Sequence, residues 1–553
     1  MRITVGQFAV KSNAIEQNYL AMKALIKQAQ SDDYDVIVFG SYALSGYGCG
    51  QHFYEQSLYD EIEAYTQQLL LLSDTITIIF GSIAYKQTVQ EVVLNILHKH
   101  TLYEHAKGHL EDRPLKEADY FSPGKLETFV MDELSLNIFF ASDYHMLKSS
   151  ASTFDPDYEC IIIDAAVVNA NKSLLGETIV YANLVGITQI NKTVFINGGN
   201  SFTNRKEKSL AFKDPLSEGL LVEDLKPTQM ITPLIALVNG LKYFSKDNFG
   251  ENKKWMIGNS GGLDSAVCLA LLSLAFGKDN VLSYNMSTQY NSEKTINNAA
   301  HLAEQLGVKH HAQRIDAAVN GYMNTINTFG YTEIPTLAYE NIMARTRGHL
   351  LGGFSSLEDA IICNNGNKLE VMLGYATLYG DAIGALSLIG DLTKVEVFKL
   401  AEAINEHFNR EVIPTNLLPK RDGYTVHFDV APSAELKHEQ KDPMKWFYHD
   451  ELTHLILKHS KSEILSMYLD NQFEHLDIGK WLAFYELNHG QNFVEDFEWF
   501  TRTFERNSFK RKQMPPVLVY SNKVIGIDFE DVNFPTPETD VEKQLKQAII
   551  KKY

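Results

Sequence analysis

The sequence predicts an α/β protein built from two domains. The chain has 553 residues, which is too long for one hydrophobic core and favours two or three domains. Short runs rich in β-branched residues alternate with amphipathic helices through the first 222 residues, a pattern typical of layered α/β domains. A strand, a glycine-rich turn and an apolar helix follow at 255–277, as at the start of a nucleotide-binding sheet.

The composition indicates a folded protein that binds neither nucleic acid nor membranes. Hydrophobic residues make up 45% of the chain, charged residues 22% and aromatic residues 11%, as in ordinary globular proteins. The net charge of -19 opposes non-specific attraction to nucleic acid and to anionic membranes. Neither a signal peptide nor a membrane-spanning stretch is evident, so we expect a cytoplasmic protein.

The four cysteines suggest no disulfide framework and no zinc site. They lie far apart and form no CxxC pair, the spacing that such sites require. They are Cys49, Cys160, Cys268 and Cys363.

The first domain is expected to span residues 1–222. Its strands are predicted where short β-rich runs occur, at 3–10, 35–40, 75–85, 136–143, 160–167 and 193–199, with a helix at 19–30. Several of these runs end in Gly, Ser or Asp, at positions where binding groups commonly lie.

The second domain is expected to span residues 233–553, after a polar, proline-containing linker at 223–232. Its elements are predicted in the order helix 233–245, strand and helix within 255–277, strand 281–287, helix 339–351, strand 360–365, a glycine-punctuated segment 374–394 and a further helix. Residues 446–505 are mostly helical in pattern, and the remainder of the chain is expected to be irregular.

The hexapeptide Ser260–Ser265 (SGGLDS) is the motif that indicates the chemistry, because it lies between a predicted strand and a predicted helix. Its two glycines let the backbone approach phosphates, and the amides at the helix start attract anions. The Ser260 and Ser265 hydroxyls can donate hydrogen bonds, and Asp264 can hold Mg²⁺ against the phosphates. The alternative is a plain Gly-Ser turn before a helix.

Further residues could bind a nucleotide, although each alone has an ordinary explanation. Arginines and lysines more often lie on a solvated surface, a loop glutamate is usually solvated, and a glycine-flanked segment can be a buried loop. These candidates are Arg345, Arg347, Glu370, the segment 375–381, Lys394 and Lys441.

The hexapeptide resembles the pyrophosphate loop of the ATP pyrophosphatases, which split ATP at the α-phosphate. It lacks the lysine of a Walker loop, which argues against γ-phosphoryl transfer. Within that group the second domain resembles NAD synthetase. The resemblance rests on blocks in family order at 339–347, 365–370, 374–381, 392–394, 432–436 and 440–442. This resemblance to NAD synthetase implies that the second domain has a parallel sheet of the adenine-nucleotide alpha-hydrolase-like kind.

The resemblance also implies site residues and a reaction. ATP would be contacted by Gly258, Asn259, Ser260, Gly261, Gly262, Leu263, Asp264, Ser265, Met286 and Asn365. Nicotinic acid adenine dinucleotide would be contacted by Asn341, Arg345, Glu370, Tyr375, Ala376, Thr377, Leu378, Asp381 and Lys510. Asp264 and Glu370 would hold Mg²⁺ and act in catalysis together with Lys394. The substrate carboxylate would be adenylated, and ammonia would then displace AMP to give NAD.

The first domain resembles the nitrilase-like glutaminase that precedes the synthetase in glutamine-dependent NAD synthetases. The matching segments are 38–39, 46–47, 107–110, 120–124, 181–186 and 198–201, and they imply an αββα sandwich. That chemistry needs a glutamate base, a lysine and a cysteine nucleophile. Lys107 is present, but Ser41 occupies the glutamate position and Ala141 the cysteine position. We therefore expect a degenerate glutaminase and free ammonia as the nitrogen source.

Several alternatives stay open at this point. Cys49 could replace the missing nucleophile, or a separate glutaminase could deliver ammonia. The second domain could be another adenylating ligase or a nucleotide-binding pseudoenzyme. Val430 replaces a lysine usual two residues before Pro432, and 524–529 replaces a basic segment that helps to join subunits in relatives. Homo-oligomers are usual in the family, so we expect one here.

Overall fold

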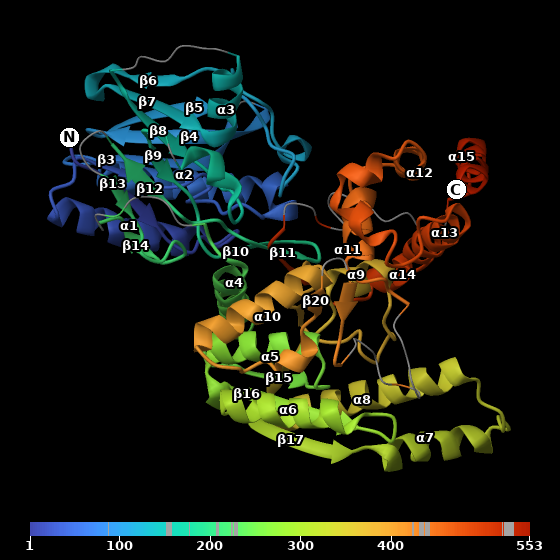
Figure 1. Ribbon diagram of the computed structural model, residues 1–553. Helices are drawn as coiled ribbons and strands as arrows, with labels where there is room; N and C mark the ends of the chain where they lie inside the picture. Colours follow the sequence, from blue (N-terminus) through green and yellow to red (C-terminus); the bar gives the residue numbers. More distant parts are fainter. Residues whose placement is uncertain are drawn as a thin grey trace. The chain divides into compact units, whose positions relative to one another are not determined.

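The computed structural model describes residues 1–86, 88–150, 157–175, 177–205, 209–222, 225, 230–422, 425–430, 436, 443–521, 524 and 536–553 (Figure 1). The chain divides into two compact units, Met1–Phe244 and Ser245–Tyr553. The division falls within helix α4 (Pro233–Phe249), whereas the sequence prediction placed all of this helix in the second domain.

The first unit contains two six-stranded sheets (Figure 1). One sheet has the order β14 (Gly219–Leu220), β1 (Ile3–Gln7), β2 (Val36–Val38), β3 (Thr77–Lys86), β4 (Val89–His98) and β5 (Thr101–Ala106). The other has the order β13 (Ser209–Ala211), β12 (Phe202–Asn204), β9 (Val180–Ala182), β8 (Glu159–Ile163), β7 (Leu136–Phe140) and β6 (Phe129–Met131). The helices are α1 (Ile15–Ser31), α2 (Gln56–Leu70) and α3 (Ala141–Ser149), and β10 (Ile187–Ile190) pairs with β11 (Thr193–Ile196) in a hairpin.

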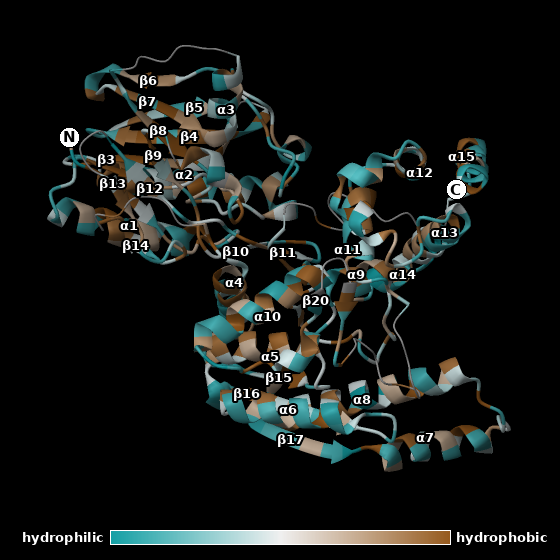
Figure 2. Ribbon diagram, in the orientation of Figure 1, coloured by the Kyte–Doolittle hydropathy of each residue, from teal (hydrophilic) through white to brown (hydrophobic). Residues whose placement is uncertain are grey.

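Side-chain alternation explains why these sheets stack as a sandwich. On β7, Ile138 and Phe140 belong to a large core that also holds residues of the other sheet, such as Val38. Phe139 instead packs in a smaller core with Tyr144 of α3. Because successive side chains of a strand point to opposite faces, one face meets the other sheet and one meets the helix. Figure 2 shows these strands largely in the brown of hydrophobic residues, and the predicted αββα sandwich is confirmed.

The second unit is built on a parallel sheet. Its strands follow the order β22 (Val517–Val519), β19 (Leu386–Ser387), β18 (Ala360–Asn364), β15 (Lys254–Gly258), β16 (Val281–Ser287) and β17 (Lys309–Arg314). The helices along this part of the chain are α5 (Leu263–Phe276), α6 (Glu293–Leu306), α7 (Asp316–Thr328), α8 (Thr336–Glu358), α9 (Lys368–Leu373) and α10 (Lys394–Phe408). A separate antiparallel pair is formed by β20 (Lys420–Asp422) and β21 (Thr425–His427).

Helices cover both faces of this sheet. Trp255 of β15 stacks on Phe276 of α5, with ring centroids 5.7 Å apart. Its neighbour Met256 points the other way, into a cluster that includes Met343 and Leu351 of α8. Such a doubly wound sheet confirms the fold predicted for the second domain.

The strand order reverses beside β15, and this reversal positions the site. From β15 the chain continues through β16 to β17 on one side, whereas β18, β19 and β22 lie on the other. In open parallel sheets, ligands bind outside the carboxyl ends of the strands at such a switch point. The hexapeptide 260–265 directly follows β15 and therefore lies at this place.

The C-terminal part of the chain is more regular than its sequence suggested. Helices α11 (Tyr448–Ile456), α12 (Lys461–Leu469) and α13 (Gly490–Arg506) confirm the predicted helical region. The residues after 505 were expected to be irregular, but they form α14 (Ser508–Arg511), strand β22 and α15 (Asp540–Lys552). Among the described residues, no helix is long and apolar enough to cross a membrane.

Candidate active site

The loop between β15 and α5 is shaped by one glycine. Gly261 has a φ of 81°, and a Cβ at this residue would lie 1.8 Å from the carbonyl oxygen of Thr295 on α6. A side chain is therefore excluded both by backbone conformation and by space. Gly262 has an ordinary φ of -86° and begins the turn into the helix.

Hydrogen bonds inside the loop hold its amides in place. The Gly261 amide donates to Asn259 Oδ1 at 3.2 Å, and the Gly262 amide donates to Ser260 Oγ at 3.2 Å. The hydroxyls of Ser260 and Ser265 lie 3.1 Å apart. The N-cap residue of α5 is Gly262, so no side chain caps this helix within the described residues. The first amides of α5 are thus available to an anion, which the helix dipole also favours.

A cavity of about 310 Å³ opens beside this loop at the carboxyl ends of β15, β16 and β18. Fourteen of the site residues that the family resemblance implies line it. They are Gly258, Asn259, Ser260, Gly262, Leu263, Asp264, Ser265, Met286, Asn365, Glu370, Tyr375, Ala376, Asp381 and Lys394.

Asp264 and Lys394 form an ion pair in this cavity. Lys394 Nζ donates to Asp264 Oδ2 at 2.6 Å, and the lysine side chain is only 3% exposed. The other carboxylate oxygen, Asp264 Oδ1, is buried and has no hydrogen-bond partner among the described residues. Because a buried carboxylate oxygen normally has a partner, this atom is the one most suited to receive a ligand or a cation.

Glu370 brings a second carboxylate to the same cavity. Its Oε2 accepts a hydrogen bond from the Asn367 amide at 3.1 Å, as part of a capping box at the start of α9. Asn367 Nδ2 also lies 3.4 Å from Asp264 Oδ2. The two carboxylates are therefore supported by one residue, and no cluster of three or more His, Cys, Asp or Glu in the described chain forms a ready-made metal cage.

Six predicted residues do not line the cavity but surround it. Gly261 shapes the loop 260–265, and the other five belong to the segment 374–381 or contact it. These five are Asn341, Arg345, Thr377, Leu378 and Lys510. Arg345 Nε donates to the Leu378 carbonyl at 3.2 Å, and Thr377 Oγ1 donates to Asn341 Oδ1 at 2.7 Å. Lys510 Nζ donates to the carbonyls of Gly374 at 3.1 Å and Ala376 at 2.8 Å.

In the first unit, Lys107 forms ion pairs, and residues next to Ser41 and Ala141 lie close to this group. Lys107 is 2% exposed, and its Nζ donates to Glu111 Oε2 at 2.7 Å and to Glu117 Oε1 at 3.0 Å. Tyr42, next to Ser41, donates to the same Glu117 oxygen at 2.5 Å. The ring of Phe140, next to Ala141, lies 5.6 Å from Lys107 Nζ.

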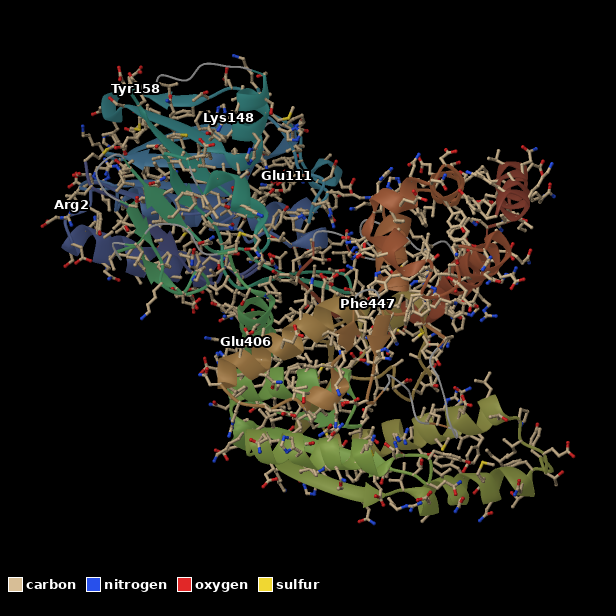
Figure 3. The ribbon with its side chains drawn as sticks, in the orientation of Figure 1. Arg2, Glu111, Lys148, Tyr158, Glu406 and Phe447 are labelled. Carbon is tan, nitrogen blue, oxygen red and sulfur yellow. The ribbon has the colours of Figure 1, made fainter. Side chains whose placement is uncertain are left out.

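Lys107 is therefore engaged in a structural ion pair. Burial opposes its charge, but Glu111 and Glu117 outweigh that cost and raise the pKa of Lys107. Glu111, labelled in Figure 3, comes from the segment that follows β5. Ala141 is the first residue of α3, is 6% exposed and carries only a methyl group, so it offers no nucleophile.

The surroundings of Cys49 disfavour a reactive thiolate. Its Sγ donates to the Ser45 carbonyl at 3.3 Å, and burial raises the pKa of the thiol to about 12. Burial likewise raises the pKa of Cys160 to about 12. Reactive cysteines are exposed and have lowered pKa values, and neither thiol combines these two features.

Comparison with known proteins agrees with this geometry. The sequence profile of the family described as NAD synthase matches residues 236–477. The chain is 32% identical over 275 residues to the NH(3)-dependent NAD(+) synthetase of Chlorobium phaeobacteroides, covering 50% of this chain and 84% of that protein. The chain belongs to the NAD synthetase family.

The similarity to two-domain NAD synthetases spans both units. The glutamine-dependent NAD(+) synthetase of Acinetobacter baylyi is 25% identical over 554 residues, covering 93% of this chain and 94% of the relative. The crystal structure of a glutamine-dependent NAD(+) synthetase from Cytophaga hutchinsonii has the same fold, with a TM-score of 0.75, 16% identity and 99% of each chain covered. The architecture is thus an NAD synthetase domain preceded by a nitrilase-like domain.

Some residues of this NAD synthetase cavity were not among the predicted site residues. Asn285 on β16 lines the cavity, and its Oδ1 is buried without a hydrogen-bond partner in the described chain. Arg347, in contrast, was named from the sequence as a candidate, and it lines the cavity whereas its neighbour Arg345 does not. Arg347 Nε donates to the Met286 carbonyl at 3.1 Å. A polar residue near the end of the apolar strand 281–287 was the available signal for Asn285.

Parts of the family pattern lie outside the described residues. These are Pro432 and most of the block 432–436, the block 440–442 with Lys441, most of 524–529 and most of the linker 223–232. Val430 and Leu436 are described, and both line the cavity.

Proposed function

We propose that this NAD synthetase amidates nicotinic acid adenine dinucleotide with ATP and free ammonia, and that its nitrilase-like domain is catalytically inactive. The ammonia dependence is inferred from the residues at the positions that glutaminase chemistry requires. Ala141 supplies no nucleophile, Lys107 is engaged by Glu111 and Glu117, and the Cys49 thiol is buried. A thioester with glutamine requires an activated thiolate.

The synthetase chemistry is supported by the second unit. In the first step a carboxylate oxygen of the dinucleotide attacks the α-phosphorus of ATP, and the bond to the departing pyrophosphate breaks. The uncapped amides at the start of α5 and the charged Lys394 would stabilise negative charge that develops on the phosphates. In the second step ammonia attacks the acyl carbon, AMP leaves with the bonding electrons, and the nitrogen loses a proton.

The cavity also fits a Mg²⁺ ion. Asp264 Oδ1 is a buried oxygen without a partner in the described chain, and Glu370 lines the same cavity. Oxygen ligands together with substrate phosphates are what Mg²⁺ prefers. Asp264 and Glu370 would hold the ion, which would withdraw charge from the phosphates.

The remaining site assignments belong to this proposal. The phosphate loop with Met286 and Asn365 would contact ATP. The segment 374–381, shaped by Asn341, Arg345 and Lys510, would contact the dinucleotide. A homo-oligomer and a cytoplasmic location stay predictions.

The test is NAD formation by purified protein from nicotinic acid adenine dinucleotide, ATP and Mg²⁺, with either ammonium chloride or ammonia-free glutamine. Ammonium is expected to support NAD formation, and glutamine is not. The matched variant Asp264→Asn should lose roughly 100-fold or more of the ammonium-dependent rate, because it removes a carboxylate placed to hold the metal.

Each other outcome identifies an alternative. Comparable rates with both nitrogen sources would show that the glutaminase is active. Glutamine use that appears only after addition of cell extract would indicate a separate glutaminase. No NAD from either source would favour a nucleotide-binding pseudoenzyme.

A further inference from the structure

An aromatic segment that precedes α11 contacts the lysine of the active site. Lys394 Nζ lies 4.9 Å from the centroid of the Trp446 ring, while the same Nζ donates to Asp264 Oδ2 at 2.6 Å. Trp446 is 5% exposed and Lys394 3% exposed. A desolvated ammonium over an indole face is a favourable cation–π arrangement.

One carboxylate ties the two segments together. Asp450 Oδ1 accepts a hydrogen bond from the Lys394 amide at 2.7 Å, and Asp450 Oδ2 accepts one from the Phe447 amide at 2.7 Å. Asp450 is 2% exposed. The start of α10, which carries Lys394, and the start of α11, which follows Trp446, are thus bridged by a single buried side chain.

The backbone between Trp446 and α11 is strained. Phe447, labelled in Figure 3, has a φ of 72° and a ψ of -49°, a conformation that a bulky residue adopts only when its surroundings enforce it. Its ring stacks on Phe398 of α10 at 5.9 Å and on Trp481 at 4.6 Å between centroids. These two stacks hold the turn in the conformation that places Trp446 beside Lys394.

The turn is also anchored on its other side. Tyr485 Oη donates to the Trp446 carbonyl at 2.9 Å. Lys445 and His449 both pair with Asp496 of α13. The position of the indole is therefore determined by contacts from several elements.

We infer that Trp446 is a positioning residue that holds the Lys394 ammonium on one oxygen of Asp264. A lysine side chain is flexible and carries three donors. The indole face occupies part of the ammonium's surroundings, which keeps Nζ on Asp264 Oδ2 and leaves Oδ1 for the cavity. This inference rests on the proposed role of Lys394 in phosphate stabilisation.

The test compares Trp446→Leu, which removes the π face, with Trp446→Phe, which keeps a smaller one. For ammonium-dependent NAD formation, kcat of the leucine variant is expected to fall about 10-fold, because a displaced catalytic group slows the chemical step. KM for ATP should change less than about 2-fold, and the phenylalanine variant should stay within about 3-fold of the unaltered kcat. Trp499→Leu is the comparison variant, because this indole stacks on His449, an anchor of the turn, rather than on Lys394, and it therefore reports the effect of loosening the anchor alone.

A different pattern is expected if Trp446 contributes only to packing. In that case both Trp446 variants lower the melting temperature while kcat stays unchanged, and the inference is overturned. Equal kcat losses in the leucine and phenylalanine variants would overturn it as well.

A double-mutant cycle keeps this inference separate from the proposed function. The shift in melting temperature caused by Trp446→Leu is measured in the unaltered chain and in a Lys394→Met background. A smaller shift in the Lys394→Met background supports the contact, and equal shifts refute it. This result does not depend on activity, so an inactive protein would refute only the proposed function.

Discussion

At the residue scale, Gly261 is the position where the loop tolerates least change. In Gly261→Ala the new Cβ would lie 1.8 Å from the Thr295 carbonyl oxygen at a φ of 81°, so the loop must move. We expect a destabilisation of about 2 kcal/mol or more and a loss of NAD formation of roughly 100-fold. Urea unfolding and steady-state kinetics measure both effects.

Gly262→Ala is the matched control for this prediction. Its φ is -86°, and the nearest atom to an added Cβ is Ser260 Oγ at 3.3 Å. The stability of this variant should stay within about 0.5 kcal/mol of the unaltered chain. Equal destabilisation by the two substitutions would contradict the role assigned to Gly261.

Asp164 should make the stability of the first unit depend on pH. Burial, reinforced by the charge of Glu111, raises the pKa of Asp164 to about 7, far above the value of about 4 for an unfolded chain. The folded state therefore binds this proton more tightly. The contribution of Asp164 to stability is fully present below about pH 4 and is lost as the pH rises through about 7.

The substitution Asp164→Asn isolates this effect. As the pH rises from 5 to 8, the urea midpoint of the variant should increase relative to that of the unaltered chain. Asp164 accepts hydrogen bonds from Tyr181 Oη and the Ala165 amide. A loss of stability in the variant that is equal at both pH values would therefore reflect only those bonds. The absence of any shift between pH 5 and pH 8 would show that the pKa of Asp164 is not raised in the folded state, because an unfolded aspartate is already charged at pH 5.

Individual cavity residues could be predicted where they belong to one short sequence motif. Asp264 lies within a hexapeptide whose residue types predict a phosphate loop, and it lines the cavity, where its role stays a prediction. Arg345 and Arg347 could not be separated from sequence, because only the packing of α8 decides which of the two reaches the cavity. Trp446 had no sequence signal at all, since its contact with Lys394 joins residues far apart in the chain.

At the element scale, prediction succeeded where apolar runs were strong. The strands predicted at 281–287 and 360–365 match β16 and β18 closely, because buried parallel strands have continuous apolar sequences. Helices α6 and α7 and strand β17 were not predicted. Strand β17 has the sequence KHHAQR and is largely exposed, so it has no hydrophobic pattern to detect.

The sequence does contain a signal for the missed C-terminal helix. Thr539 and Glu542 form a capping box at the start of α15, a spacing that can be recognised from sequence. Buried Ile549 lies on the face that packs against α13, where its carbonyl closely approaches Gly490. The polar composition of 536–548 concealed this short apolar face.

At the scale of the whole molecule, the two-domain organisation followed from chain length and from the order of the motifs. The position of the division between the units could not be predicted, because it lies within α4, which is one continuous helix. The proposed ammonia dependence of the whole chain likewise rests on residues that are missing. Family resemblance locates Ser41 and Ala141, but only the structure shows that Lys107 is engaged by two carboxylates and that Cys49 is buried.

The whole chain should therefore be inert toward an electrophilic glutamine analogue. Cys49, Cys268 and Cys363 are buried and Cys160 is only partly exposed, and burial raises the thiol pKa of Cys49 and Cys160 to about 12. Intact-protein mass spectrometry after incubation at neutral pH is expected to show the unmodified mass. The variant Ala141→Cys should gain one adduct, because a thiol at the first residue of α3 has its pKa lowered by the helix dipole. An adduct on the unaltered chain that disappears in Cys49→Ala would identify Cys49 as a nucleophile and refute the inactive glutaminase.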